Sequence, residues 1–231
     1  MSILFDQDGV RIHWLSGAVY LEKDGYGLLV DAPATAVSLL EDRLPYIQSI
    51  VLTSGRIASV GGLVSVLCAL DATRSVDIPL ALHFAFGEER GAMMAEAWVR
   101  GWPSGFPLIL DGEVPGGKFD AGPFSLSTAG LKCGEPEWGI GRIRPTIGMA
   151  LTISTGGLTV ARVPATGVNP VVSKICRDVD LAIVDVGVVP WPESSIPWRM
   201  TVDDAVALGS GAKHLILVGD NGELVGPNGW Q

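Results

Sequence analysis

Residues 50–63 read Ile50-Val51-Leu52-Thr53-Ser54-Gly55-Arg56-Ile57-Ala58-Ser59-Val60-Gly61-Gly62-Leu63. An apolar run comes first, a turn of small and polar residues follows, and the two glycines precede a second apolar run that continues to Leu70. A short apolar run bounded by turn residues is typical of a buried strand, and a longer one is typical of a helix. The pattern predicts a buried strand at residues 49–52, a loop around Ser54, and a helix at residues 61–70.

This stretch resembles the metal-binding motif of the metallo-β-lactamase superfamily. In that motif an apolar strand leads into Thr-His-x-His-x-Asp-His, one further residue, and Gly-Gly-Leu. Thr53 and residues 61–63 match the frame of the motif. The ligand positions carry Ser54, Arg56, Ala58 and Ser59, none of which is a metal ligand of that family.

Further segments are similar to the family in its own order, and its ribonuclease Z-like branch fits best. Residues 20–32 resemble the strand that ends in an aspartate before the first helix, so Asp31 is the one family acid in place. Residues 157–167, 180–185, 199–205 and 213–220 are similar to the later segments. In these segments the ligand positions fall on Ala165, Arg199 and Gly219, and the remaining family histidine falls near Cys133 or Arg144.

The resemblance implies an α/β fold, a four-layer αββα sandwich, in a single domain over residues 1–231. Two halves that each carry strands followed by helices favour the same arrangement. Strands are predicted at residues 10–15, 18–22, 28–30, 49–52, 80–84, 108–110, 124–128, 149–154, 158–163, 181–186 and 214–218. Helices are predicted at residues 35–43, 61–70, 88–102 and 201–208. A hairpin turn is predicted at residues 155–157, and surface loops are predicted at residues 112–117 and 133–142.

The histidine content argues against the metal site of the family. The chain has three histidines, His13, His83 and His214, within or at the end of predicted strands. A dinuclear site of this family uses about four or more imidazoles together with carboxylates. Arg56 and Arg199, at former ligand positions, would repel a divalent cation. The sequence therefore predicts no metal, no cofactor and a degenerate active site.

Two interpretations remain for the residues expected to line the former metal cleft, Ser54, Arg56, Ser59 and Arg199. In one, the arginines and hydroxyls form a pocket for a carboxylate or phosphate, helped by free N–H groups of Gly61-Gly62 at a helix N-terminus. In the other, which we favour from sequence, both arginines pair with Asp31, Asp185 or Asp220 and fill the space left by the metal.

Tryptophan is frequent, with seven residues in the chain. Trp191, Trp198 and Trp230 lie late in the sequence, the first two in a proline-rich loop at residues 188–198. Aromatic side chains in a rigid loop suit a protein interface because docking costs little entropy. They could equally cover the edge of the core. The resemblance adds weight to the interface, because the family often forms dimers.

Composition bounds the partners and the location. A net charge of −9 disfavours extended contact with a nucleic acid backbone. The longest apolar run, residues 60–70, is too short to span a bilayer. The acidic N-terminus lacks the pattern of a secretory signal, so we expect a cytoplasmic protein without membrane contact. Cys68, Cys133 and Cys176 are widely spaced and suggest neither disulfides nor a zinc knuckle.

The function expected from these observations is that of a metal-free pseudoenzyme that binds a partner protein or a small anion, or scaffolds a complex. The alternative is a hydrolase of phosphoesters or esters with a relocated metal site. A third interpretation is that the protein is a purely structural subunit. A serine hydrolase is not favoured, because Ser54 and Ser59 lack the Gly-x-Ser-x-Gly elbow and a nearby histidine partner.

Overall fold

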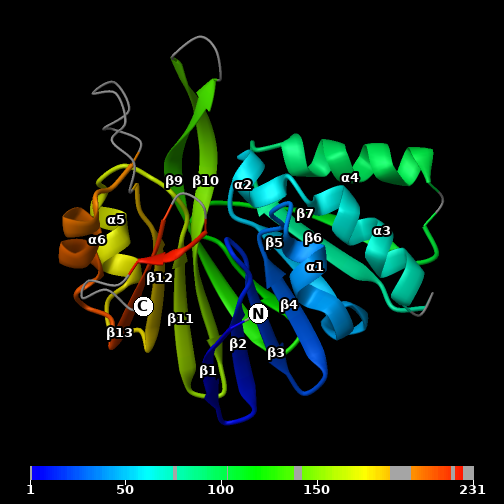
Figure 1. The fold of residues 1–231 in the computed structure, drawn as a ribbon, viewed down its shortest axis with the longest axis horizontal. Coiled ribbons are helices and arrows are strands. Elements are labelled where there is room, and N and C mark those ends of the chain that lie inside the picture. The colour runs from blue at the N-terminus through cyan, green and yellow to red at the C-terminus, as the bar shows by residue number, and fades with distance from the viewer. Residues whose placement is uncertain are drawn as a thin grey trace. The chain divides into compact units, whose positions relative to one another are not determined.

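The computed structural model describes residues 2–74, 77–102, 104–137, 142–187, 199–219 and 222–225. The chain divides into two compact units (Figure 1). Unit 1 comprises residues 1–113 and 120–124, and unit 2 comprises residues 114–119 and 125–231. The described residues form two seven-stranded sheets, and in both sheets the strands lie side by side in the order in which they follow along the chain.

The first sheet changes from antiparallel to parallel pairing at β4. Its strands are β1 (Ser2–Gln7), β2 (Val10–Trp14), β3 (Val19–Lys23), β4 (Tyr26–Val30), β5 (Ile47–Leu52), β6 (Leu80–Ala85) and β7 (Leu108–Glu113). β1 to β4 form an antiparallel meander. β4 to β7 pair in parallel, so their carboxyl ends lie at one edge of the sheet.

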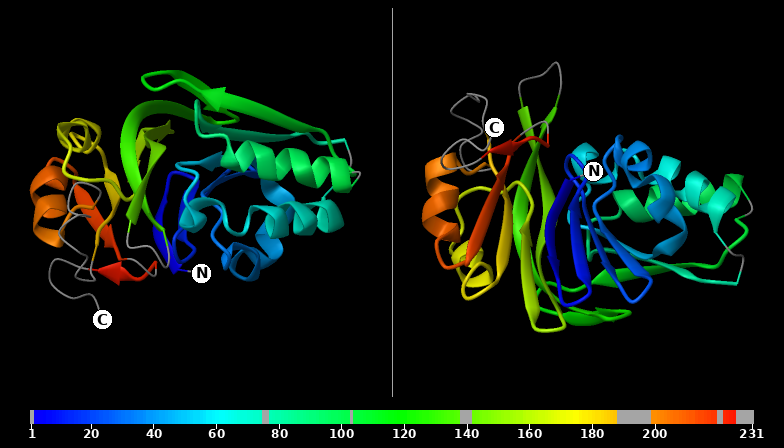
Figure 2. Two further views of the ribbon diagram at one scale, coloured as in Figure 1. Left: turned by 90° about the horizontal axis from the view of Figure 1, so that it is seen from above. Right: turned by 60° about the horizontal axis from the view of Figure 1, so that its bottom comes forward.

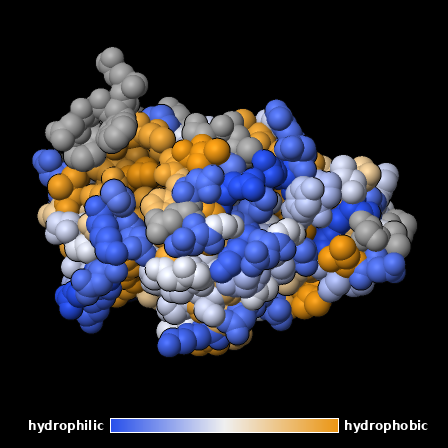
Figure 3. Space-filling model, turned by 90° about the horizontal axis from the view of Figure 1, so that it is seen from below, coloured by the Kyte–Doolittle hydropathy of each residue, from blue (hydrophilic) through white to orange (hydrophobic). Residues whose placement is uncertain are grey.

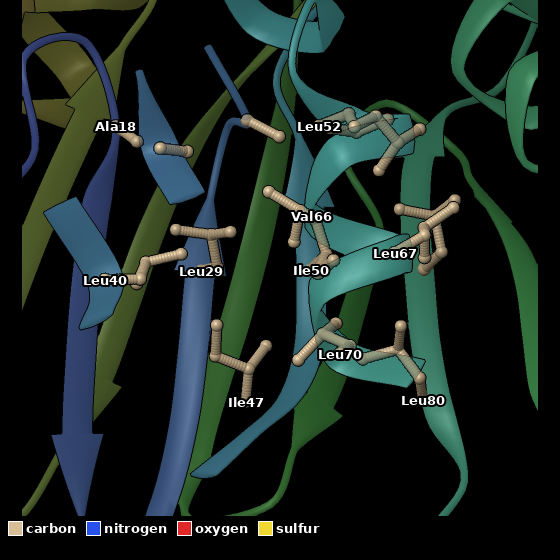
Figure 4. Close-up of a cluster of buried hydrophobic side chains, with 14 of the residues drawn as sticks. Ala18, Leu29, Leu40, Ile47, Ile50, Leu52, Val66, Leu67, Leu70 and Leu80 are labelled. Carbon is tan, nitrogen blue, oxygen red and sulfur yellow. The ribbon is translucent and has the colours of Figure 1, made fainter. Parts of the chain in front are cut away.

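The helices of unit 1 pack their apolar sides on this sheet. They are α1 (Ala36–Leu40), the 3-10 helix η1 (Glu41–Tyr46), α2 (Ile57–Val60), α3 (Leu63–Thr73) and α4 (Arg90–Gly101). In α3 the buried residues Leu63, Val66, Leu67 and Leu70 follow the helical period. They belong to one core cluster with Leu29, Ile50 and Leu80 of the sheet (Figure 4). This packing fixes where α3 begins, and therefore the loop that precedes it.

The second sheet is likewise mixed. Its strands are β8 (Lys118–Ala121), β9 (Phe124–Glu137), β10 (Arg142–Thr155), β11 (Leu158–Val163), β12 (Leu181–Asp185), β13 (His214–Val218) and β14 (Leu224–Val225). β11, β12 and β13 pair in parallel. The helices α5 (Pro170–Ile175) and α6 (Val202–Gly209) lie beside these strands (Figure 2) and join them in a second core cluster through Val172 and Ala205.

The β9–β10 hairpin corrects one prediction. Residues 133–142 were expected to form a surface loop, yet Cys133 pairs with Thr146 and Glu137 pairs with Arg142 in a continuous antiparallel ladder. Figure 1 shows the hairpin extending beyond its neighbouring strands. Gly130, Gly134 and Pro145 interrupt the side-chain alternation that would have marked these strands in the sequence.

The helix predicted at residues 35–43 is also wrong as a single α-helix. Glu41 adopts a φ of 43°, which ends α1, and Pro45 lies in the 3-10 turn η1 that follows. The helix predicted at residues 61–70 begins at Leu63 and is preceded by the short helix α2. The strands β1, β8 and β14 and the helix α5 were not predicted.

The predicted hairpin turn between β10 and β11 is confirmed. Thr155 pairs with Leu158, and Gly156 and Gly157 both have positive φ angles, 55° and 85°. Such angles at both central positions match the twist of the flanking strands. In the part of the chain that the structure describes, no helix is long and apolar enough to cross a membrane.

Candidate anion site in unit 1

Polar side chains gather where the parallel strands of unit 1 end. Asp31 follows β4, Thr53 and Ser54 follow β5, and Glu88 lies three residues beyond the end of β6. The carboxyl ends of parallel strands are where α/β sheets bind ligands, because the loops there converge. This edge contains the loop between β5 and α2, residues 53–56, which carries the motif frame.

Asp31 anchors the loop after β5. Its Oδ1 accepts hydrogen bonds from the backbone N–H of Thr53 at 2.8 Å and from the Thr53 hydroxyl at 2.8 Å, and the hydroxyl also lies 2.8 Å from Oδ2. The Asp31 backbone has a φ of 66° and its N–H donates to the Val51 carbonyl. Asp31 is 1% exposed. The carboxylate therefore shapes the turn from β5 into the loop.

Two serines extend the chain of hydroxyls that begins at Thr53. Ser54 Oγ and Ser59 Oγ are 3.0 Å apart, and Ser59 Oγ is 3.5 Å from Thr53 Oγ1. The N–H of Arg56 donates to Ser54 Oγ at 3.4 Å. The helical turn of α2 brings Ser59 back toward Ser54, so the structure places these two predicted residues together, and both are buried.

Arg56 is buried without a counterion among the described residues. Its side chain is 8% exposed, and its Nε has no hydrogen-bond partner. Within the described ranges no hydrogen bond or ion pair of the guanidinium is found, and pairing with Asp31 or Asp185, favoured from sequence, is not among its contacts. Asp220 lies outside the described residues.

Glu88 and Arg90 complete the surroundings of the loop, and the sequence analysis missed both. Arg90 Nη1 donates to the Gly55 carbonyl at 2.5 Å, and Glu88 Oε1 accepts from the Arg90 N–H at 3.2 Å. A Cβ on Gly55 would lie 2.0 Å from Glu88 Oε1. The glycine at this position lets the carboxylate pack against the loop, and it was the one sequence signal for such an approach.

The glycine pair before α3 does not offer the free N–H groups expected of it. Gly61 N–H donates to the Ile57 carbonyl at 2.8 Å, and Gly62 N–H donates to the Ala32 carbonyl at 2.7 Å. A Cβ on Gly62 would lie 2.1 Å from the Pro33 carbonyl oxygen. The glycines therefore allow α3 to approach the loop after β4, and they hold the backbone rather than a ligand.

In unit 2 a different arginine neutralises Asp185. Arg162 is 2% exposed and forms two hydrogen bonds with the carboxylate, Nη1 to Oδ1 at 2.5 Å and Nη2 to Oδ2 at 3.1 Å. The N–H of Ala165, where the family places a bridging aspartate, donates to Asp185 Oδ2 at 3.2 Å. Asp185, at the end of β12, is thus held by Arg162 of β11 and by the backbone just beyond β11.

The remaining predicted residues lie elsewhere. Arg199 belongs to unit 2 and packs its side chain against Gly187, so its membership of one pocket with Ser54, Arg56 and Ser59 stays a prediction. Gly219 follows β13 and its N–H donates to the Glu223 carbonyl. Trp191, Trp198 and Trp230 lie outside the described residues.

The donor set of the motif loop does not fit a dinuclear metal centre. Its side chains are hydroxyls tied to Asp31 and a guanidinium, and neutral imidazoles and free carboxylates are what such centres use. Among the described residues, no group of three or more histidine, cysteine, aspartate or glutamate side chains converges. His83 instead contacts Glu113, with Nδ1 and Oε1 2.8 Å apart.

Solved structures of other proteins resemble the chain closely in fold. Neither a protein-family model nor a curated protein sequence matches it. Human tRNase Z, short form, is similar with a TM-score of 0.68 and 15% identity over 89% of this chain and 87% of that chain. Zn(2+)-bound PqqB from Methylobacterium extorquens is similar with a TM-score of 0.67 and 14% identity over 89% and 77%.

A third similar structure is described by the name of its fold. The metallo-β-lactamase fold protein YhfI from Bacillus subtilis is similar with a TM-score of 0.65 and 16% identity over 87% of this chain and 77% of that chain. The structural similarity shows the fold, and identities this low leave the activity open. The α/β architecture expected from the motif frame is confirmed.

Proposed function

We propose, from the premise that the chain has the metallo-β-lactamase fold, that it is a metal-free pseudoenzyme that binds a small anion or a partner protein instead of hydrolysing a substrate. One observation carries the proposal. At the carboxyl edge of the parallel strands, where the motif frame is intact, the loop presents a buried guanidinium and tied hydroxyls.

The charges at the loop support a site that binds an anion rather than a metal. A divalent cation beside Arg56 would meet a fixed positive charge in a place with little water to screen it. Asp31, the one family acid in place, already accepts the Thr53 N–H and hydroxyl. The loop therefore favours an anion over a cation.

Metal content tests the proposal directly. We expect the purified protein to contain no stoichiometric zinc, iron or manganese by elemental analysis, and its melting temperature to be unchanged by a chelator. A zinc enzyme of the same fold, purified in parallel, is the control. Near-stoichiometric metal and a chelator-sensitive melting temperature would contradict the proposal and support the alternative, a hydrolase of phosphoesters or esters with a relocated metal site.

Partner binding is the second part of the proposal. Figure 3 shows apolar residues gathered at the left of one face, and contiguous apolar surface is typical of interaction sites. The proposed partner is another protein or a second copy of the chain in the cytoplasm, with Trp191, Trp198 and Trp230 at the contact. Light scattering of the wild type and of the three tryptophan-to-alanine variants tests this binding. A monomer at all concentrations that captures no protein would contradict it.

A further inference from the structure

Among the described residues, no carboxylate pairs with the guanidinium of Arg56. The side chain is more than nine-tenths buried, and Nε has neither a protein acceptor nor exposure to water. A buried charge without a partner destabilises a protein strongly, because desolvation is not repaid. Arg74, which is equally buried in the same unit, donates through Nη2 to the carbonyls of Ile78 and Pro79, although its Nε and Nη1 have no partner either. No described residue accepts a hydrogen bond from any nitrogen of the Arg56 guanidinium, which leaves the whole group available to a ligand.

The hydroxyl chain supplies a second donor. An ionised Asp31 only accepts hydrogen bonds, so the Thr53 hydroxyl hydrogen points to it. If the Ser59 hydroxyl donates to Ser54 Oγ across their 3.0 Å contact, the Ser54 hydroxyl hydrogen is not used in that bond and can be donated to a ligand. Ser54 Oγ lies 3.4 Å from the backbone nitrogen of Arg56, and its hydroxyl hydrogen can rotate toward an acceptor that binds at this turn.

Charge and geometry select the kind of anion. Arg56 carries a single positive charge, so one negative charge balances it, whereas a dianion would leave a net negative charge in a buried place. The planar fork of a guanidinium matches a carboxylate with two parallel hydrogen bonds. The small remaining exposure of Arg56 and Ser59, 8% and 6%, admits only a compact ligand.

We infer that Arg56, assisted by the hydroxyl of Ser54, is the binding site for a small monocarboxylate. This inference rests on the proposed absence of a metal at the same loop. The inference adds the class of ligand to the proposed function. The site lies at the carboxyl ends of β4 and β5, where parallel sheets commonly bind ligands.

Calorimetric titration and thermal shift test the inference, with acetate and formate as probes, inorganic phosphate as the dianion, and chloride at equal ionic strength as the reference. We expect saturable carboxylate binding that raises the melting temperature and exceeds phosphate binding. Arg56→Gln should weaken it about 10- to 100-fold, and Ser54→Ala by a smaller factor, because hydrogen bonds to charged groups are the strong ones. Arg56→Lys should bind more weakly than the wild type, because the fork is lost while the charge stays.

The matched control is Arg74→Gln, which removes the same charge from an equally buried position, and Arg100→Gln on the exposed face of α4 replaces it if that variant does not fold. Both should bind carboxylate as the wild type does. Tighter binding of phosphate, no saturable binding, or equal binding by Arg56→Gln would overturn the inference. Metal analysis of the same samples separates the two proposals: metal-free protein that ignores carboxylates contradicts only this one, and bound metal contradicts both.

Discussion

At the scale of the residue, Arg56 and Arg162 form a natural pair for comparison. Both are buried guanidinium groups, but Arg162 is paired with Asp185 and Arg56 has no counterion among the described residues. Without a carboxylate ligand, Arg56→Met should raise the free energy of unfolding by roughly 1–3 kcal/mol, because a desolvated charge is removed. Arg162→Met should lower it by about 3 kcal/mol, because Asp185 loses its partner.

Urea unfolding in a carboxylate-free buffer measures both changes. The opposite signs are what distinguishes the two arginines. A loss of stability in Arg56→Met equal to that in Arg162→Met would mean that Arg56 has a partner within the protein.

His13 predicts how stability depends on pH. Burial, and next the positive charge of Arg43, lower the pKa of His13 below 6.5, while Glu22 acts in the opposite direction. The unfolded chain therefore binds this proton more readily, so the free energy of unfolding falls as pH decreases from about 6.5 toward the lowered pKa. His13→Leu should flatten this part of the pH profile of urea unfolding. An unchanged slope would assign the acid sensitivity to other groups.

At the scale of the element, the approach of α3 to the loop after β4 depends on Gly62. A Cβ there would lie 2.1 Å from a backbone oxygen, which cannot move aside as a side chain could. Gly62→Ala should therefore destabilise the protein by about 1–3 kcal/mol. Gly101→Ala in α4, where a Cβ meets no atom within 4 Å, should instead stabilise by about 0.5–1 kcal/mol. Thermal melting compares the two; equal effects would mean that the close approach at Gly62 is absent.

Elements with strong periodicity could be predicted from the sequence, and those with weak signals could not. The buried strand β5 and helices α3 and α4 were recognised by their apolar patterns, within a few residues at their ends. α5 was missed because it has only six residues, although Asn169 caps it and Pro170 stands in its first turn.

Only part of the candidate site could be predicted from the sequence. Ser54 and Ser59 are five positions apart, so a short loop was enough to suggest their proximity. Glu88 and Arg90 approach Gly55 from more than thirty positions away, across the pairing of β5 with β6. Residues this far apart in the sequence form no local pattern, so their contact with Gly55 could be recognised only from the pairing of the strands.

At the scale of the whole molecule, the net charge of −9 leads us to expect no general binding to nucleic acid. Human tRNase Z has a similar fold, but the excess of negative charge in this chain repels a phosphate backbone. We expect no shift of tRNA by the protein in gel electrophoresis at low salt, where electrostatic binding is strongest. A tRNase Z is the positive control, and a shift that disappears as salt increases would contradict the expectation.

The order of the strands has a consequence for how the chain is made. In the first sheet every strand pairs with the strands that precede and follow it in the sequence. Pairing between strands that are neighbours in sequence closes shorter loops than pairing between distant strands would, and a lower sequence separation of contacts favours faster folding. A chain that leaves the ribosome N-terminus first can therefore add β1 to β7 one after another, and the first sheet can be complete before β9 is synthesised.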